Sequence, residues 1–329
     1  MEIKDLAGIS EPLKRLIEVI SEGAGAISHP YLIRKNADAK AYEIRVISQA
    51  MAESHALLGG MEYEDGKIKI LPESQESSEQ LSLPNRTENR RKYQELRKQQ
   101  NIESICANSA ELLIGESQVA EDKPESDWIN RFFEIAENIS AEELQYIWGK
   151  ILAGEIQKPG SFSFRTLETL KNMSRQEAEN FCKLGQYVFQ TSNMAFYVNP
   201  EEYLFKQENT LGFAEIFALK DAGVVADSDL LQFSFNPSSA GTTSQIFYGS
   251  LILFFEREKD TPKITSRVGA LTKAGVELLK LVPIQPDIEY VKFIAQHLHA
   301  DGMKVAWAPV VKTEGDLIYT GDKTYLESM

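Results

Sequence analysis

The chain has 329 residues, 43% hydrophobic and 26% charged, which predicts a folded protein of about two domains. Its formal net charge of −14 means that nucleic acid would have to meet a local basic patch. Cys106 and Cys182 have no metal or redox spacing and suit a reducing cytosol. We expect a cytoplasmic protein, since no signal pattern is present and no stretch approaches the ~20 apolar residues that span a bilayer.

Residues 1–60 predict an N-terminal helical segment. Ser10 and Pro12 favour a helix start, and a second helix is expected over residues 31–58. The first helix has an apolar stripe flanked by basic residues, so it could lie on an anionic membrane. Acidic residues on its polar face instead favour packing against a neighbouring helix. The stripe consists of Leu13, Leu16, Ile17 and Ile20.

Residues 61–84 read as a linker, in which the short piece "KIKIL" could form an edge strand. The rest of this segment is rich in Ser, Glu and Gln, and it cannot bury enough apolar surface to order itself.

Residues 85–190 predict a central helical bundle, which begins with one long helix over 85–116. Asp127 and Ser163 are candidate helix caps. Two S-x-x-E patterns, starting at Ser140 and Ser174, predict capping boxes. Trp148 is expected in the core, because it lies on a stripe at the i, i+3, i+4, i+7, i+8 spacing of a core-facing helix. The stripe consists of Leu144, Ile147, Trp148, Ile151 and Leu152.

Residues 191–329 predict a C-terminal α+β domain, so the whole chain is expected to be α+β. Thr272 and Asp287 are candidate caps of its last two helices. The order of helix, glycine, two strands and "LTKAGVELLKLV" resembles a winged-helix unit. Its recognition helix would be "AEIFALKDAG", in which Lys220 is the sole base, and this argues against DNA reading.

Catalytic motifs are not apparent, and we expect no catalytic residue, metal or cofactor. His297 and His299 are two apart on a predicted helix, so they point to different faces and cannot chelate one ion. The sequence has no phosphate-binding glycine loop and no nucleophile elbow.

Two sets of charged residues are candidate interaction sites. A basic run in the long helix could meet the phosphates of lipid headgroups or of nucleic acid, or could be a solvated face with i, i+4 pairs. Glu155 and Arg165 could clamp the connection between two helices as an ion pair, a role favoured over ligand binding. The basic run comprises Arg86, Arg90, Arg91, Lys92, Arg97 and Lys98.

Two stretches resemble a known family. They are "LKRLIEVISEGAGAISHPYLIRKNADAKAYE" and the segment from "WINRFFEIAENI" through "ELQYIWGKILAGE" and "PGSFSFRTL" to "ENF". Both resemble an uncharacterised bacterial domain-of-unknown-function family and are distantly similar to Abi-alpha abortive-infection proteins. The resemblance implies a bacterial cytosolic protein of phage resistance that works through contacts, with no catalytic residues to transfer.

The leading hypothesis is therefore a non-enzymatic interaction or sensor protein of antiviral defence, acting through protein or lipid contacts. One alternative is a membrane-surface lipid-binding effector, peripheral to an anionic membrane. Another is a winged-helix DNA-binding regulator. A protein partner is expected, nucleic acid is disfavoured, and the apolar stripes permit a homo-oligomer.

Overall fold

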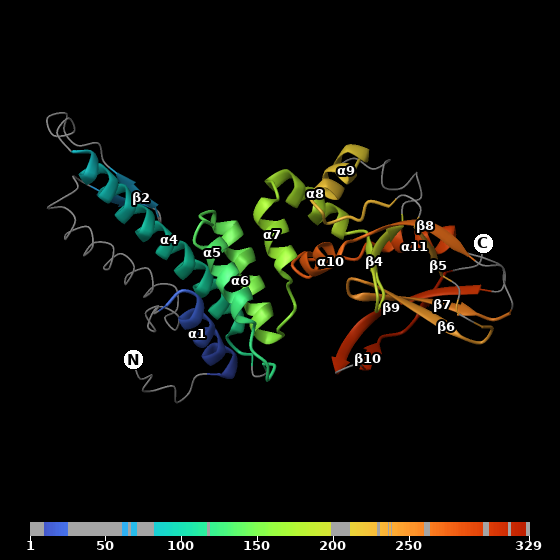
Figure 1. Cartoon of the computed structure of the whole chain (residues 1–329). Helices are drawn as coiled ribbons and strands as arrows, with labels where there is room; N and C mark the ends of the chain where they lie inside the picture. The colour runs from blue at the N-terminus through green and yellow to red at the C-terminus, as the bar shows by residue number, and fades with distance from the viewer. Residues whose placement is uncertain are drawn as a thin grey trace. The chain divides into compact units, whose positions relative to one another are not determined.

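The computed structural model describes residues 10–25, 61–64, 67–70, 82–116, 119–198, 211–228, 231–235, 237, 239–259, 264–298, 303–314 and 317–326. The chain folds as two compact units, Met1–Ser161 and Phe162–Met329 (Figure 1). The composition of the sequence instead predicts a domain boundary between residues 190 and 191. The predicted domain ranges stay predictions.

The first unit is built mainly from helices. They are α1 (Glu11–Gly23), α4 (Leu83–Leu113), α5 (Ser126–Ala136) and α6 (Glu142–Gln157). A hairpin of β1 (Met61–Glu64) and β2 (Lys67–Ile70) is antiparallel, which confirms the strand expected at "KIKIL". The predicted helix over 31–58 and residues 71–81 of the predicted linker lie outside the described residues.

The core of this unit forms where α6 packs against α4 and α5. Trp148 is 1% exposed and tilts against Phe132, which confirms its predicted place in the core. Gly149 lets the two long helices approach closely, because a Cβ there would lie 2.7 Å from the Asn108 Cβ. Leu144, expected on the same stripe, is 39% exposed, whereas its neighbour Gln145 is buried.

Helix α1 turns its apolar stripe inward. Leu16, Val19 and Ile20 are buried, and Gly23 packs directly on Phe133 of α5. Leu16 and Ile20 of the predicted stripe are therefore used for packing within the unit, the role that the acidic residues on the polar face favoured, while Leu13 and Ile17 are half-buried. Membrane contact by this helix stays a prediction.

Three predicted helix starts are confirmed, because their signals are local. Ser174 and Glu177 form the reciprocal capping box of α8 (Arg175–Gly185), while Thr272 caps α10 (Lys273–Leu279) and Asp287 caps α11 (Ile288–His297).

Two predicted caps are wrong by one or two residues. Helix α6 begins at Glu142 with Ala141 as its N-cap, so Ser140 lies outside the helix and makes no box with Glu143. Helix α5 begins at Ser126, which places Asp127 in the first turn. There its charge favours the positive end of the helix dipole.

The second unit combines short helices with one antiparallel sheet of nine strands among the described residues. The strand order is β10-β9-β7-β6-β3-β4-β8-β5, with β11 also pairing with β9. The helices are α7 (Phe164–Asn172), α8 (Arg175–Gly185), α9 (Phe213–Asp221), α10 (Lys273–Leu279) and α11 (Ile288–His297). The strands are β3 (Val188–Gln190), β4 (Ala195–Val198), β5 (Gln232–Ser234), β6 (Thr243–Tyr248), β7 (Leu251–Arg257), β8 (Thr265–Ala270), β9 (Met303–Glu314), β10 (Leu317–Thr320) and β11 (Thr324–Tyr325).

The core of the second unit lies between the sheet and α11. Tyr290 and Ile294 of α11 pack on strand residues that include Phe189 and Phe255. The Tyr248 hydroxyl donates to the Gln186 carbonyl at 2.6 Å and accepts from the Asp287 amide at 3.2 Å. Helices in the first unit and a sheet in the second confirm the α+β class.

The winged-helix arrangement is not what this sheet forms. The hairpin β6–β7, expected to be the wing, lies inside the sheet, since β6 pairs with β3 and β7 pairs with β9. Five consecutive residues of β7 are buried, as expected for a strand covered on both faces. A wing would instead be a free hairpin exposed to solvent.

Candidate interaction surface

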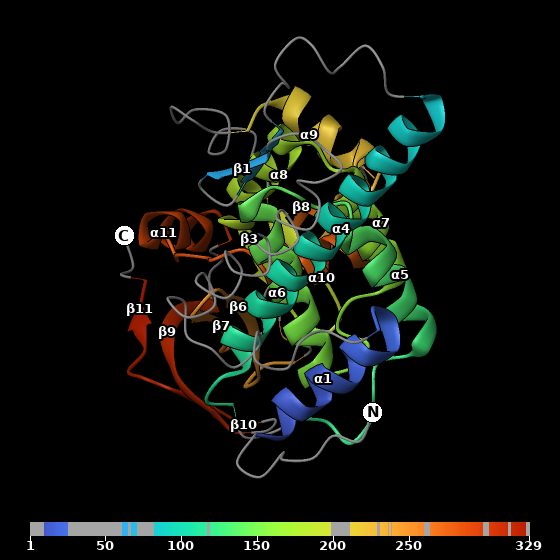
Figure 2. The same cartoon turned by 90° about the vertical axis from the view of Figure 1, so that its left-hand side faces the viewer.

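Helix α4 is divided into a buried half and an exposed half. Its C-terminal half lies in the core of the first unit, where Ile105, Cys106 and Leu113 are fully buried. From residue 82 to residue 97, every side chain is exposed except those of Asn89 and Tyr93, which are half-buried. In both views the exposed half extends beyond α5 and α6 (Figures 1 and 2). The helix is thus held at one end and displayed at the other.

The local sequence explains why this half remains helical without a core. Pro84 occupies the first turn, where its missing N–H has no helical partner to lose. Beyond it the helix contains neither Gly nor Pro, and most residues are good helix formers. An i, i+4 hydrogen bond from Gln99 to Glu103 at 2.8 Å adds support near the point where the helix enters the core.

Three of the predicted basic residues share one face of α4. Arg86, Arg90 and Arg97 lie at i, i+4 and i+11, and Tyr93 lies between them at i+7, so all four align along the helix. The three arginine side chains are exposed, and within the described part of the chain they make no ion pair. We call Arg86, Arg90, Tyr93 and Arg97 the arginine face.

The remaining basic residues of the run lie elsewhere on the helix. Arg91 and Lys92 are exposed but are rotated away from the arginine face by more than a quarter turn. The Lys92 ammonium lies 3.9 Å from the Glu88 carboxylate, as an i, i+4 pair. The structure therefore separates residues that the sequence groups together.

Lys98 has a structural partner. Its ammonium donates to the Glu137 carboxylate across 2.8 Å, which links α4 to the end of α5. This hydrogen bond and the charge of Glu137 raise the pKa of Lys98 above its ordinary value. Lys98 thus helps to fix α4 in the first unit.

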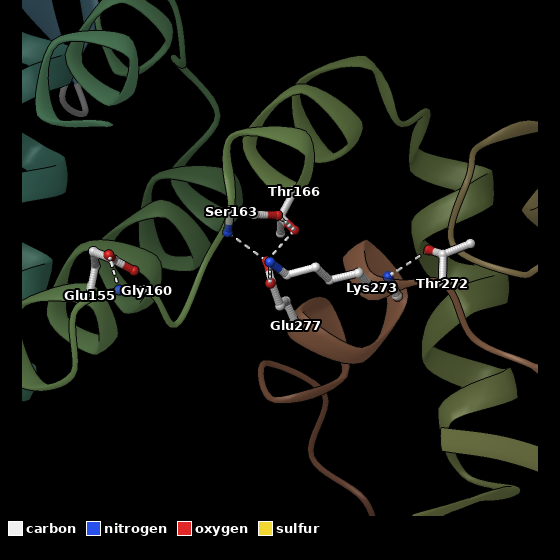
Figure 3. A network of polar contacts seen from close by, with 8 residues as sticks. Glu155, Gly160, Ser163, Thr166, Thr272, Lys273 and Glu277 are labelled. Atoms are coloured by element: carbon white, nitrogen blue, oxygen red, sulfur yellow. Dashed lines mark hydrogen bonds and ion pairs between the residues drawn. The ribbon is translucent and has the colours of Figure 1, made fainter. Parts of the chain in front are cut away.

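Glu155 and Arg165 lie in different units. Glu155 is 2% exposed at the end of α6, and its carboxylate accepts the Gly160 amide at 2.6 Å (Figure 3). Gly160 has a φ of +81°, a conformation that glycine adopts without strain, so this contact closes the turn after the helix. Arg165 is exposed in the first turn of α7. The ion pair expected between the two residues remains a prediction.

Glu277 is a site residue that the sequence did not single out. It is 5% exposed on α10, and its carboxylate accepts the Ser163 amide at 2.6 Å and the Thr166 hydroxyl. Glu277 thus caps the start of α7, the role expected of the Ser163 side chain. The Lys273 ammonium lies 3.8 Å from the Glu277 carboxylate (Figure 3). One sequence signal could have identified Glu277. It follows Ala274 by three residues, so the two lie on the same, inner side of a short helix.

The two thiols are poor candidates for nucleophilic chemistry. Cys106 is fully buried, and burial raises its pKa far above the ordinary value of a thiol. Cys182 is exposed, yet partial desolvation raises the pKa of its thiol, with the charge of Glu179 adding to the effect. Since the thiolate is the reactive form, both sites favour the unreactive thiol.

Two further kinds of feature, a metal site and a membrane-spanning helix, are absent from the described residues. Among the described residues, no three His, Cys, Asp or Glu side chains are grouped so that they could hold a metal ion. Within the same residues, no helix is both long enough and apolar enough to cross a membrane.

Residues 85–295 match the model of a family described as "Protein of unknown function (DUF2806)". The chain belongs to the DUF2806 family. The DUF2806 match takes in nearly all of α4, including the arginine face, and it also contains Glu155, Arg165 and Glu277. No curated protein and no solved structure matches the chain.

Proposed function

We propose that this DUF2806 protein is a non-enzymatic interaction or sensor protein that recognises an anionic partner through the exposed half of α4. The observation that carries the proposal is the arginine face. Three guanidinium groups without ion-pair partners in the described residues are aligned on a helix that is anchored at its other end. A solvated row of positive charges attracts anions, and the ordered helix sets the spacing of these charges before an anion binds.

The setting that we propose is cytoplasmic antiviral defence in bacteria. It rests on the resemblance to Abi-alpha abortive-infection proteins that we infer from the "ELQYIWGKILAGE" and "PGSFSFRTL" segments of the sequence alone. The first segment forms α6, which packs on the buried half of α4. The resembling segment therefore supports the helix that displays the arginine face.

Contact rather than turnover is the proposed mode of action. The arginine face lies on the open side of a helix, and the pKa of each cysteine thiol is raised above its ordinary value. A sensor of this kind would act by occupying, or being displaced from, a partner surface.

A peripheral lipid surface is the second candidate for the partner. Leu83 is 68% exposed at the start of α4, on the same side as Arg86, and could enter an acyl layer beside lipid phosphates. Flotation of the full chain with anionic and neutral vesicles at two salt concentrations tests this candidate. Salt-sensitive flotation with anionic vesicles alone is the expected result, and no flotation with either vesicle removes it.

The proposed function is tested by phage challenge of bacteria that express the chain. The double variant Arg86→Gln/Arg90→Gln removes two charges from the arginine face, and Arg91→Gln/Lys92→Gln removes two charges from the same helix outside it. All four side chains are exposed, so both variants should fold. We expect the first variant to lose protection and the second to keep it. No protection by the unaltered chain, or equal protection by both variants, contradicts the proposal.

A further inference from the structure

The residues that border the arginine face include uncharged amide side chains, and the acidic residues of this stretch lie elsewhere. Asn89 and Gln94 border it at neighbouring helical positions, and Gln94 is exposed. Glu88 and Glu95 lie on the opposite side of the helix, half a turn away. The face therefore presents arginine, tyrosine and side-chain amides, with the acids turned away from it.

These are the residue types that bind the backbone of nucleic acids. Contacts to phosphate and sugar in such complexes come from Arg and Lys and from the hydroxyl and amide side chains of Ser, Thr, Asn, Gln and Tyr. A guanidinium group can also donate two parallel hydrogen bonds to one phosphate. The face contains three arginines and one tyrosine, and two amides border it; each of these side chains can donate to phosphate.

The geometry of the face suits a duplex. Arg86 and Arg97 are eleven residues apart, which at about 1.5 Å per residue makes a straight row of roughly 16 Å. An exposed α-helix fits the major groove of a duplex and can reach the phosphates along its walls. An interfacial membrane helix would instead carry an extensive apolar face. The aliphatic residues exposed on this side of α4 are Leu83, at the very end, and Leu96, which lies on the same border as Asn89. Two isolated leucines do not form such a face.

The net charge of −14 does not prevent this contact, since it describes the whole surface and not one helix. Helix α9 is poorly suited to DNA, since Lys220 is its sole base and Phe213 and Phe217 are exposed on it. Neither observation bears on the exposed half of α4.

We propose that the arginine face binds the phosphate backbone of a nucleic-acid duplex, without reading its bases. The inference rests on the proposed function and names the partner of the same surface. Arg86, Arg90 and Arg97 each contact a phosphate, and Tyr93, Asn89 and Gln94 add hydrogen bonds to phosphate or sugar. Arg91, Lys92 and Lys98 take no part.

The test measures binding of a fluorescent DNA duplex of arbitrary sequence to the full chain by anisotropy, between about 50 and about 200 mM salt. Each phosphate contact contributes about −0.9 to the slope of log K against log salt, so three contacts predict a slope of about −2.7. Arg86→Gln/Arg90→Gln should reduce this slope by about 1.8 and weaken binding on the order of a hundredfold at the lower salt concentration.

The matched control is Arg91→Gln/Lys92→Gln, which removes the same charge from the same exposed stretch. Its slope should stay near that of the unaltered chain. Equal losses in both variants would show a diffuse charge effect and overturn the proposal, as would no duplex binding by the unaltered chain. Salt-sensitive flotation with anionic vesicles in the absence of duplex binding would also overturn it, in favour of lipid.

Failure of this inference can be told apart from failure of the proposed function. If the arginine-face variant loses phage protection but the chain binds no duplex, the partner is wrong and the function stands. If the chain binds duplex through the face but the variant still protects, the binding proposal stands and the defence role falls.

Discussion

At the scale of single residues, two buried carboxylates accept backbone amides next to helix ends. Glu155 closes the turn after α6 through the Gly160 amide, and Glu277 reaches from α10 to the first turn of α7. A buried carboxylate that accepts an amide and a hydroxyl removes the desolvation cost of both donors. Polar groups buried in this way are expected to be sensitive to truncation.

Replacing Glu277 tests this directly. Glu277→Ala leaves the Ser163 amide and the Thr166 hydroxyl without their acceptor and should cost roughly 2–3 kcal/mol of unfolding free energy. Glu277→Gln retains an acceptor oxygen and should cost about 1 kcal/mol. Urea denaturation followed by circular dichroism measures both. Equal midpoints for Glu277→Ala and the unaltered chain would mean that the contact does not stabilise the unit.

The Lys98–Glu137 pair makes a prediction about alkaline pH. Because the pKa of Lys98 is raised in the folded chain, its contribution to stability is fully present below the unfolded pKa of about 10.4. The contribution is lost as the pH rises through the higher folded value. The difference in urea midpoint between the unaltered chain and Glu137→Gln should therefore be constant from about pH 8 to about pH 9.5 and shrink above about pH 10.5. A difference that grows with pH contradicts this assignment.

At the scale of elements, α4 is the decisive piece, since one helix has both a core role and a surface role. Its buried half depends on the close approach of α6 at Gly149. The exposed half depends on helix propensity and on side-chain pairs. The crossing of the two helices thus positions the arginine face.

A methyl group at that crossing separates helix propensity from packing. Gly149→Ala should gain about 1 kcal/mol from propensity, yet the new Cβ would lie 2.7 Å from the Asn108 Cβ. Overpacking costs about 1–3 kcal/mol, so we expect a net loss or at best no gain. Adding Asn108→Gly removes the nearest clashing atom, although the Ser109 amide nitrogen would still lie 3.2 Å from the new Cβ. The double variant should therefore be more stable than the sum of the single changes predicts. A stabilising Gly149→Ala would show that the helices can separate there at no cost.

Local signals predicted much of the fold, and non-local contacts set the rest. The long helix, buried Trp148, and the caps at Ser174, Thr272 and Asp287 each depend on a few neighbouring residues. The placement of β6–β7 inside a sheet depends on strands distant in sequence, so the hairpin alone suggested a wing.

The candidate site was predictable only in part for the same reason. The basic run could be read from the sequence. Which of its residues share an exposed face, and which pair with an acid, could not. Lys98 forms an ion pair with Glu137, which lies 39 positions further along the chain. Packing of α6 against α4 determines where α4 becomes buried. Glu277 was missed because its partners, Ser163 and Thr166, precede it by more than a hundred residues.

At the scale of the molecule, the two units contribute differently to the account. The DUF2806 match crosses from the first unit into the second and so covers both the displayed helix and much of the sheet. The proposed contact, however, uses α4 alone. The sheet unit presents a different kind of surface, since its exposed large side chains include Phe213 and Phe217.

The central claim is that the arginine face of α4 is where the protein meets its anionic partner. Arginine modification with phenylglyoxal, read by mass spectrometry of the unaltered full chain, tests it most directly. Modification is compared for the free chain, with a DNA duplex, and with anionic vesicles. The account predicts that the duplex protects Arg86, Arg90 and Arg97 and leaves Arg91 as reactive as before. Protection of the same arginines by vesicles and not by the duplex would mean that the surface is correct and that its partner is lipid. Equal protection of Arg91, or no protection by either probe, would contradict the account.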